Sequence, residues 1–267
     1  MTKKEVQKIV WDYYKKHGRH SLPWRKTTNP YRILVSEVML QQTQVTRVLP
    51  KYKSFLKKFP NFTSLAHAPR RHVLIEWQGL GYNRRAKYLH QTAQEVTKGK
   101  KRLPKTYVEL KTLPGVGDYT ARAVCVFAHG QALPLIETNI RTVFIHHFFR
   151  KNEHVSDAEL FHIAEEVLDT KHPREWNWAL MDYGTFLKEQ GITTHRKSTQ
   201  YVKQKPFKGS DRELRGMIIR ELSKTKHLTL QEFKERSNVS MGQLKKQVSR
   251  LKKENLIQVN TGGSWSL

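Results

Sequence analysis

Helical periodicity constrains the fold of this chain more than any other feature of its sequence. From residue 1 to about residue 195, apolar side chains recur mostly at the spacing of helices, and alternating runs typical of strands are nearly absent. Steps into proline divide this pattern at intervals typical of helix boundaries, at Asn29-Pro30, Phe59-Pro60, Leu103-Pro104 and His172-Pro173. We therefore predict an all-α fold for residues 1–195.

The C-terminal part of the chain follows a different pattern. Residues 196–210 are basic, polar and weakly periodic, so we expect a linker there. Residues 211–267 predict three helices, the third at 240–254, and then a hairpin around Asn260-Thr261-Gly262-Gly263. This order resembles a winged helix-turn-helix whose recognition helix, at 240–254, carries Lys245 and Lys246 toward DNA. A small packing or protein-contact domain is the alternative.

The charge of the chain indicates a polyanionic partner. It has 49 Lys and Arg against 23 Asp and Glu, a net charge of +26 spread from end to end. Nucleic acid is the first expectation, and the ribosome or an anionic membrane surface are the alternatives. No apolar run approaches the ~18 residues of a membrane span, and the N-terminus lacks a signal-peptide core. We therefore expect a cytoplasmic, nucleoid-associated monomer that does not bind membranes.

A single cysteine limits the metal chemistry that this chain can perform. Cys125 lies in an apolar stretch, which predicts a packed core residue. One thiol cannot form an intramolecular disulfide, a four-cysteine zinc site or a four-thiolate iron–sulfur cluster. The 13 histidines are scattered without partners at metal-ligand spacing. We predict no metal site and no cofactor.

The sharpest local motif is Leu113-Pro114-Gly115-Val116-Gly117, which precedes Asp118-Tyr119-Thr120 and an apolar helix. Two glycines around one apolar residue allow a tight turn with outward-pointing amides at a helix N-terminus, a geometry that suits a phosphate oxygen. An ordinary turn between helices is the alternative for a bare Gly-x-Gly. The complete motif resembles the DNA-binding hairpin of helix-hairpin-helix proteins, so we expect Gly115, Val116 and Gly117 to contact DNA.

A second motif places an acid in an apolar helix. Asn29 can cap this helix, Pro30 suits its first turn, and Glu37 sits among apolar neighbours. Desolvation raises the pKa of such an acid, which is what a general acid near neutral pH needs. A solvated surface glutamate is the alternative.

Four motifs in order resemble the MutY-type adenine DNA glycosylases of the helix-hairpin-helix superfamily, to which endonuclease III-like enzymes also belong. The similarity runs from about residue 5 to 187. It implies a two-lobed helical fold around a DNA cleft, with one lobe at about 27–130 and the other formed by 1–26 plus 131–195. The motifs that carry it are Leu22-Pro23-Trp24-Arg25, Ser36-Glu37-Val38-Met39-Leu40-Gln41-Gln42-Thr43-Gln44, Gly79-Leu80-Gly81-Tyr82 and Leu113–Gly117.

The resemblance implies roles for individual residues. Glu37 matches the acid that protonates the flipped base and then helps to position water, and Tyr119 and Asn139 match residues that line the pocket. Relatives similar to endonuclease III carry a lysine at position 119, which forms a Schiff base and cleaves the strand. Tyr119 therefore implies a monofunctional enzyme. The further DNA-contacting residues implied are Arg25, Gln41, Gln42, Thr43, Leu80 and Tyr82.

The chain departs from the family pattern in three places. Glu137 stands where the family has its catalytic aspartate; we expect Thr138 to cap the following helix and to leave the Glu137 carboxylate free for the sugar. A polar stretch at 188–191 stands where the cluster cysteines normally follow 181–184. Residues 211–267 predict a winged helix instead of the family's oxidised-guanine-reading domain. The resemblance thus implies a clusterless variant.

The function that we expect is monofunctional DNA glycosylase activity in base excision repair, on a flipped mispaired base, first of all adenine, in double-stranded DNA. Glu37 would protonate adenine at N7, and Glu137 would stabilise the oxocarbenium-like sugar, in the two-carboxylate logic of glycosidases. Two alternatives stay open. One is a uracil or thymine mismatch DNA glycosylase, and the other is a non-catalytic DNA-binding or regulatory protein that has kept the fold.

Overall fold

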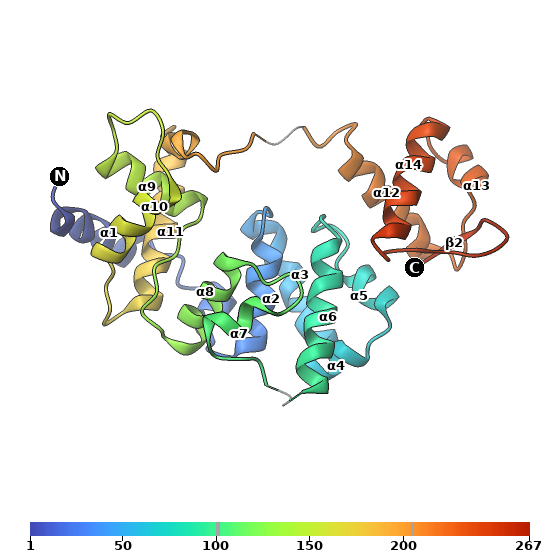
Figure 1. Ribbon diagram of the computed structural model, residues 1–267, viewed down its shortest axis with the longest axis horizontal. Helices are drawn as coiled ribbons and strands as arrows, with labels where there is room; N and C mark the ends of the chain where they lie inside the picture. Colours follow the sequence, from blue (N-terminus) through green and yellow to red (C-terminus); the bar gives the residue numbers. More distant parts are fainter. Residues whose placement is uncertain (100–101, 204–205) are drawn as a thin grey trace. The chain divides into compact units, whose positions relative to one another are not determined.

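Helices make up most of the computed structural model, which describes residues 1–99, 102–203 and 206–267 (Figure 1). The all-α fold expected for the first part of the chain is confirmed, because the two described strands both lie after residue 257. The chain forms two compact units. Unit 1 comprises Met1–Glu37, Pro104–Thr112 and Val116–Lys203; unit 2 comprises Val38–Leu103, Leu113–Gly115 and Gln204–Leu267.

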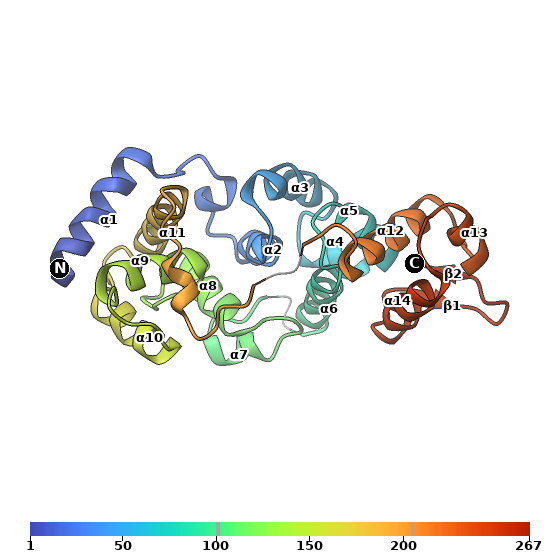
Figure 2. The same ribbon diagram turned by 90° about the horizontal axis from the view of Figure 1, so that it is seen from above.

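Unit 1 is built around the long helix α11, on which α1 and α9 pack (Figure 2). Aromatic side chains lie between α11 and its neighbours: the ring centroids of Trp11 of α1 and Trp176 are 5.7 Å apart, and Phe127 of α8 stacks on Trp178 with 5.3 Å between centroids. The elements of this unit are α1 (Lys3–His17), η1 (Pro23–Lys26), most of α2 (Pro30–Leu40), α7 (Tyr107–Lys111), α8 (Asp118–His129), α9 (Thr138–Phe148), α10 (Asp157–Glu166), α11 (Pro173–Glu189) and η2 (Thr194–Lys197).

Local sequence explains where several of these helices begin. Thr2 and Glu5 form a capping box on α1, and Ser156 and Glu159 form another on α10. Asn29 caps α2 as predicted, since its side-chain oxygen accepts the amide of Arg32 at 3.1 Å. These caps satisfy backbone amides that the first turn of a helix leaves without partners.

Unit 2 contains the end of α2, four helices that follow it, and the C-terminal segment. Helix α6 packs on α4 and α5, and the indole of Trp77 is buried against Phe55 with 5.9 Å between the ring centroids. The elements that follow α2 in this unit are α3 (Val45–Lys58), α4 (Phe62–His67), α5 (Arg70–Glu76), α6 (Arg84–Lys98), α12 (Asp211–Lys224), α13 (Leu230–Glu235), α14 (Met241–Lys253), β1 (Gln258–Val259) and β2 (Trp265–Ser266).

The three helices and the hairpin predicted after residue 210 are present. Strands β1 and β2 pair antiparallel with Val259 opposite Trp265, and the Trp265 ring is buried 6.2 Å from Phe233 of α13. The identification of this segment as a winged helix-turn-helix stays a prediction, as do the domain boundaries and the two lobes. Of the predicted linker at 196–210, residues 204–205 lie outside the described residues, and residues 196–197 close η2.

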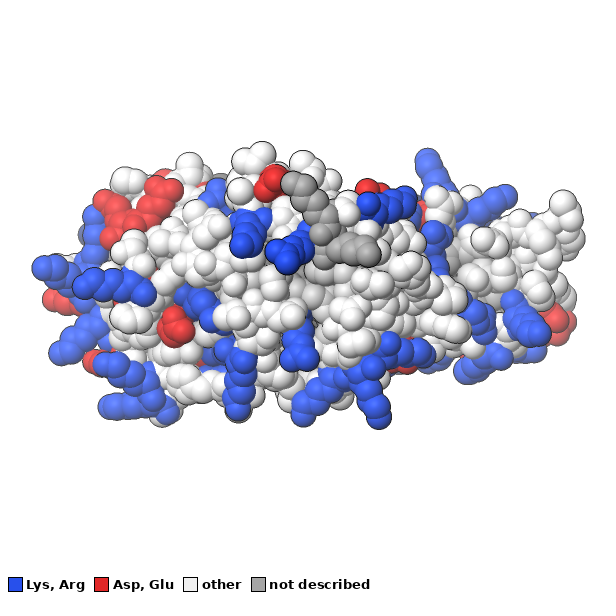
Figure 3. Space-filling model, turned by 90° about the horizontal axis from the view of Figure 1, so that it is seen from below, with Lys and Arg blue, Asp and Glu red and all other residues white. Residues whose placement is uncertain are grey.

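The surface matches the basic composition of the chain. Lys and Arg side chains are spread over the face seen in Figure 3, where acidic side chains are fewer. Among the described residues, no helix combines the length and apolar character needed to cross a membrane.

Gly184 allows α9 and α11 to pack closely. A Cβ atom on Gly184 would lie 2.2 Å from the backbone oxygen of Asn139 at the start of α9. Real side-chain atoms do not approach backbone this closely, so a larger residue at position 184 would push the two helices apart.

We predict that Gly184→Ala lowers the free energy of unfolding by about 1–3 kcal/mol, because the added methyl group overpacks the contact between α9 and α11. Gly216→Ala is the matched control: Gly216 lies within α12, and a Cβ atom there would meet nothing within 4 Å. This control should gain roughly 0.5–1 kcal/mol from a better helix former. Urea unfolding followed by circular dichroism measures both, and equal stability of the two variants would contradict the packing argument.

Candidate active site

A buried acid lies on α2. Glu37 is only 6% exposed, and its helix neighbours Val35, Ser36 and Val38 are buried as well. The solvated surface glutamate that the sequence left as an alternative is therefore wrong. Burial withholds water from the carboxylate, and this disfavours its charged form.

Tyr119, in the first turn of α8, contacts this acid. Its hydroxyl donates a hydrogen bond to Oε2 of Glu37 at 3.2 Å. Burial raises the pKa of Glu37 to about 7; the bond from Tyr119 opposes this rise, and the nearby charge of Glu137 adds to it. Burial and the same two carboxylates raise the pKa of Tyr119 well above its usual range, so the phenol keeps its proton and acts as a donor.

Glu137 caps α9, and this corrects one expectation. Its Oε1 accepts the amides of Asn139 and Ile140 at 2.8 and 3.0 Å, so Thr138 does not take over the capping. The extended backbone at Glu137, with φ −133° and ψ 178°, lets the longer side chain fold back onto the helix end. Burial raises the pKa of Glu137, while the two amides oppose the rise by stabilising the charged form.

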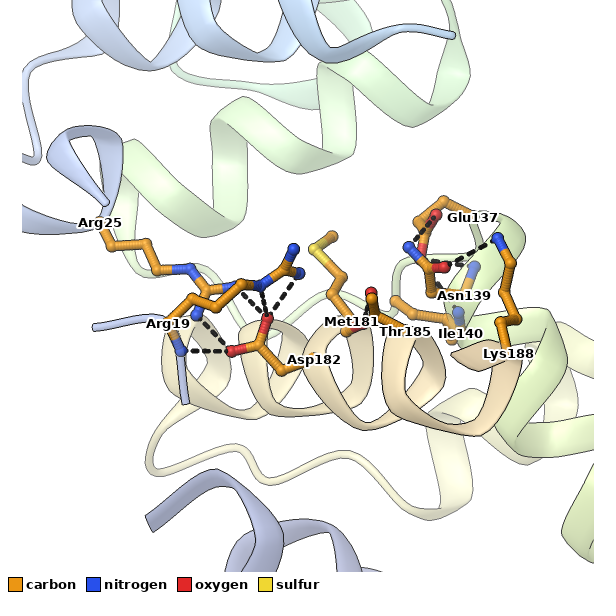
Figure 4. A network of polar contacts seen from close by, with 9 residues as sticks. All are labelled: Arg19, Arg25, Glu137, Asn139, Ile140, Met181, Asp182, Thr185 and Lys188. Carbon is orange, nitrogen blue, oxygen red and sulfur yellow. Dashed lines mark hydrogen bonds and ion pairs between the residues drawn. The ribbon is translucent and has the colours of Figure 1, made fainter. Parts of the chain in front are cut away.

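Asn139 joins Glu137 to the end of α11 (Figure 4). Its amide nitrogen donates to Oε2 of Glu137 at 3.3 Å, and its oxygen accepts from Nζ of Lys188 at 3.2 Å. The ammonium of Lys188 also favours the ionised form of Glu137. Lys188 was not singled out from the sequence, because residues 188–191 were noted only as the polar stretch that stands in place of the family's cluster cysteines.

A buried ion pair lies two turns earlier on α11 (Figure 4). Asp182 accepts two hydrogen bonds from the guanidinium of Arg25, at 2.6 and 2.8 Å, and further ones from the backbone and side chain of Arg19. Burial would raise the pKa of Asp182, but the two arginines hold it below its usual range. The Arg25 side chain is only 4% exposed and lies 5.4 Å from the Trp178 ring centroid, so its environment is that of a structural cation inside the protein.

In unit 2, Arg85 ties together the two loops that the family resemblance singles out. From α6, its buried guanidinium donates to the carbonyl of Gln41 and to those of Leu80 and Gly81. It also bonds the Thr43 hydroxyl at 3.0 Å, and that hydroxyl lies 3.2 Å from the Leu80 carbonyl. Nothing in the sequence distinguished this arginine from the exposed ones around it.

The remaining DNA-contact candidates differ in exposure. In the described structure, Gln42 is exposed with a left-handed backbone (φ 53°), whereas Leu80 is 2% exposed. Gly115 has φ +73°, and a Cβ atom there would collide with the Tyr88 side chain at 2.5 Å. Three further candidates are half-buried, namely Gln41, Thr43 and Tyr82, and Val116 is buried. The exposed ones are Gly117, which directly precedes α8, and Lys245 and Lys246 on α14.

The chain's residues do not fit a four-thiolate cluster. The sequence contains one cysteine, Cys125, and it is buried in α8 as predicted. Within residues 1–99, 102–203 and 206–267, no three His, Cys, Asp or Glu side chains are grouped so that they could hold a metal ion. The expectation of a cofactor-free protein stays a prediction.

The sequence is similar to that of known DNA repair proteins. Residues 35–168 match the family described as HhH-GPD superfamily base excision DNA repair protein. The adenine DNA glycosylase of Buchnera aphidicola subsp. Baizongia pistaciae is 35% identical over 190 residues, which cover 70% of this chain and 54% of that protein. The adenine DNA glycosylase of Mycolicibacterium smegmatis is 43% identical over 129 residues, 48% of this chain and 44% of that protein. The chain thus spans about half the length of these curated relatives.

Solved structures agree with the sequence matches. The structure of a thermostable thymine-DNA glycosylase superposes with a TM-score of 0.61 at 26% identity, covering 68% of this chain and 85% of that one. The resemblance predicted from the four motifs is therefore confirmed, and so is the helix-hairpin-helix glycosylase fold. Because the family match spans half of its residues, this chain belongs to the HhH-GPD superfamily of base excision DNA repair proteins.

Proposed function

We propose that this protein is a monofunctional DNA glycosylase that releases a mispaired base, adenine in the first place, by hydrolysis. The observation that carries the proposal is the buried Glu37, which is hydrogen-bonded to Tyr119 and has a pKa of about 7. The names of the relatives, adenine DNA glycosylase, support the choice of base.

The chemistry needs an acid that is still protonated near neutral pH. Cleavage of an N-glycosidic bond leaves the electron pair on the base, so protonation of adenine at N7 makes the base a better leaving group. With a pKa of about 7, Glu37 is largely protonated below pH 7 and loses its proton as the pH rises. The acid-dependent rate should therefore fall above pH 7.

A second carboxylate stabilises the sugar cation. Glu137 sits at the N-terminus of α9, where two amides hold one of its oxygens. Within the part of the chain that the structure describes, its other oxygen accepts a single, longer hydrogen bond, from the Asn139 side-chain amide at 3.3 Å. This oxygen is the one that faces the oxocarbenium-like sugar in our proposal, because it is bound less tightly. Asn139 and Lys188 then set the orientation and charge of the group.

The partner is double-stranded DNA that contains a mispaired base, bound by a monomer without an iron–sulfur cluster. The net charge of +26 supports binding to the phosphate backbone. Flipping the target base leaves a gap in the stack, which side chains from the protein must fill. In our proposal Gln42 and Tyr82 fill it, and Gly115 and Gly117 contact phosphate. Lys245 and Lys246 add phosphate contacts from α14. Because Arg25 is buried against Asp182, we leave it out of the contact set.

A second candidate is removal of thymine or uracil from mismatches with guanine. The structural similarity to a thymine-DNA glycosylase favours it, although at 26% identity this is weaker support than the 35% and 43% identity to the adenine enzymes. One assay separates the candidates: duplexes carrying adenine, uracil, thymine or hypoxanthine opposite guanine, 8-oxoguanine, cytosine or adenine, with alkali to reveal abasic sites.

In this assay we predict release of adenine without strand cleavage, because Tyr119 offers no amine to attack the sugar. Strand breaks should appear only after alkali, on denaturing gels. Breaks before alkali, with an adduct trapped by borohydride, would contradict the monofunctional mechanism. Loss of that adduct in Lys188→Gln would then identify Lys188 as the amine. If the wild type releases no base from any duplex, the protein is a non-catalytic DNA-binding protein.

We predict that Glu37→Gln abolishes base release but keeps the affinity for mismatched duplex nearly unchanged. Glutamine has the same shape and can accept the Tyr119 hydrogen bond, but it cannot deliver a proton, so only the transition state is affected. Single-turnover rates and binding isotherms measure the two effects. Activity of the variant within tenfold of the wild type would exclude Glu37 as the acid.

For Glu137 we predict that its charge contributes more to the rate of base release than its capping of α9 does. Glutamine can still accept the two amides but removes the charge, so Glu137→Gln should lose about two to three decades in rate. Glu137→Asp retains the charge and is a good cap, so it should lose less. Thermal midpoints of both variants control for the cap. Wild-type turnover by Glu137→Gln would mean that the second carboxylate is another residue.

A further inference from the structure

Tyr82 lies in a turn and has an unfavourable backbone conformation. The turn joins α5 to α6, and Tyr82 has φ 47°, a left-handed conformation that non-glycine residues rarely adopt. The preceding Gly79 and Gly81 also have positive φ. The Trp77 indole and the Arg85 guanidinium donate to the Gly81 carbonyl, at 3.1 and 3.2 Å. The turn therefore keeps one conformation, and the position of the Tyr82 ring depends on its side-chain contacts.

Cations of α5 and α6 bind the C-terminal segment within unit 2. Arg71 donates to the carbonyls of Leu222, Ser223 and Thr225 at the end of α12, at 2.8, 2.9 and 3.2 Å. At the end of α14, Lys87 donates to the carbonyl of Glu254, at 2.7 Å. The last carbonyls of a helix lack partners within it and carry the negative end of its dipole, so cations bind there favourably.

This docking brings the first turn of α12 to Tyr82, with α12 lying beside α5 (Figures 1 and 2). Nη1 of Arg212 donates to the Tyr82 hydroxyl at 2.7 Å, and its guanidinium carbon lies 5.7 Å from the ring centroid. The Arg85 guanidinium lies 5.4 Å from the same centroid. Two guanidinium groups therefore contact one aromatic ring, and one of them comes from the C-terminal segment.

We infer that Arg212 is a positioning residue that holds the Tyr82 ring in the orientation in which it enters the duplex. The inference rests on the proposed function, since Tyr82 fills the gap only in a base-flipping enzyme. A hydrogen bond at the hydroxyl and a cation over the ring fix the two side-chain torsions of Tyr82 before DNA binds. Ordering the ring in advance removes part of the entropy that binding would otherwise lose. The docked C-terminal segment thus contributes to base flipping through Arg212.

The first test needs no DNA. In the full-length protein with 13C-labelled tyrosine, the ring signal of Tyr82, assigned by Tyr82→Phe, should shift in Arg212→Met. It should stay unchanged in Arg220→Met, a control that removes the same charge from the same helix. Thermal midpoints of both variants show that the fold is kept. An unchanged Tyr82 signal in Arg212→Met would overturn the inference, whatever the activity of the protein.

The second test measures flipping with 2-aminopurine at the target position, at protein concentrations that saturate the duplex. Arg212→Met should lower the rate of the fluorescence rise by about tenfold, and Arg212→Lys, which keeps the donor and the charge, should restore most of it. Because Arg212 acts through Tyr82, Arg212→Met should cause no further loss in a Tyr82→Ala background.

An equal loss in both backgrounds would overturn the positioning role, because Arg212 would then act without Tyr82. A failure of the proposed function looks different. The wild type would then release no base from any duplex, and the role of Arg212 in base release would be overturned with it, while the ring signal would still report the contact.

Discussion

The hydrogen bond between Tyr119 and the buried carboxyl of Glu37 is the interaction on which the account of this protein depends. It joins α2 to α8 within unit 1 and holds a carboxyl group that is largely shielded from water. Burial raises the pKa of Glu37 to about 7, and the charge of Glu137 adds to the effect. Glycosidic bond cleavage requires two carboxyl groups close enough to influence each other, one that still holds a proton near neutral pH and one whose charged form is stabilised, here by amides.

Helix α11 is the scaffold that holds the second half of this arrangement. Asp182 pairs with Arg25, Gly184 lets the start of α9 approach closely, and Lys188 binds Asn139 beside Glu137. These three residues lie within about two turns of one helix, and Figure 4 shows Asp182 and Lys188 beside their partners. Helix α11 therefore packs against the start of α9 and orients the side chains around its capping glutamate.

The elements that could be predicted from sequence are those with local causes. Helix α2 with its Asn29 cap, the hairpin at 258–266 and the buried Cys125 follow from capping, turn chemistry and apolar patterning. The Glu137 cap could not be predicted, because a statistical preference for shorter caps says nothing of how a longer side chain folds back. Contacts of Arg85 and Arg212 were missed for another reason. A buried arginine has the same sequence appearance as an exposed one, and Arg212 reaches a residue 130 positions away.

The most direct measurement of the central claim is the pKa of Glu37 itself, by 13C NMR of its side-chain carboxyl, assigned with Glu37→Gln. A titration midpoint near 7 is the expected result. In Tyr119→Phe the midpoint should move higher, because the lost hydrogen bond stabilises the charged carboxylate. A midpoint near the ordinary glutamate value of about 4.3 would contradict the account, since Glu37 would then hold no proton to donate at neutral pH.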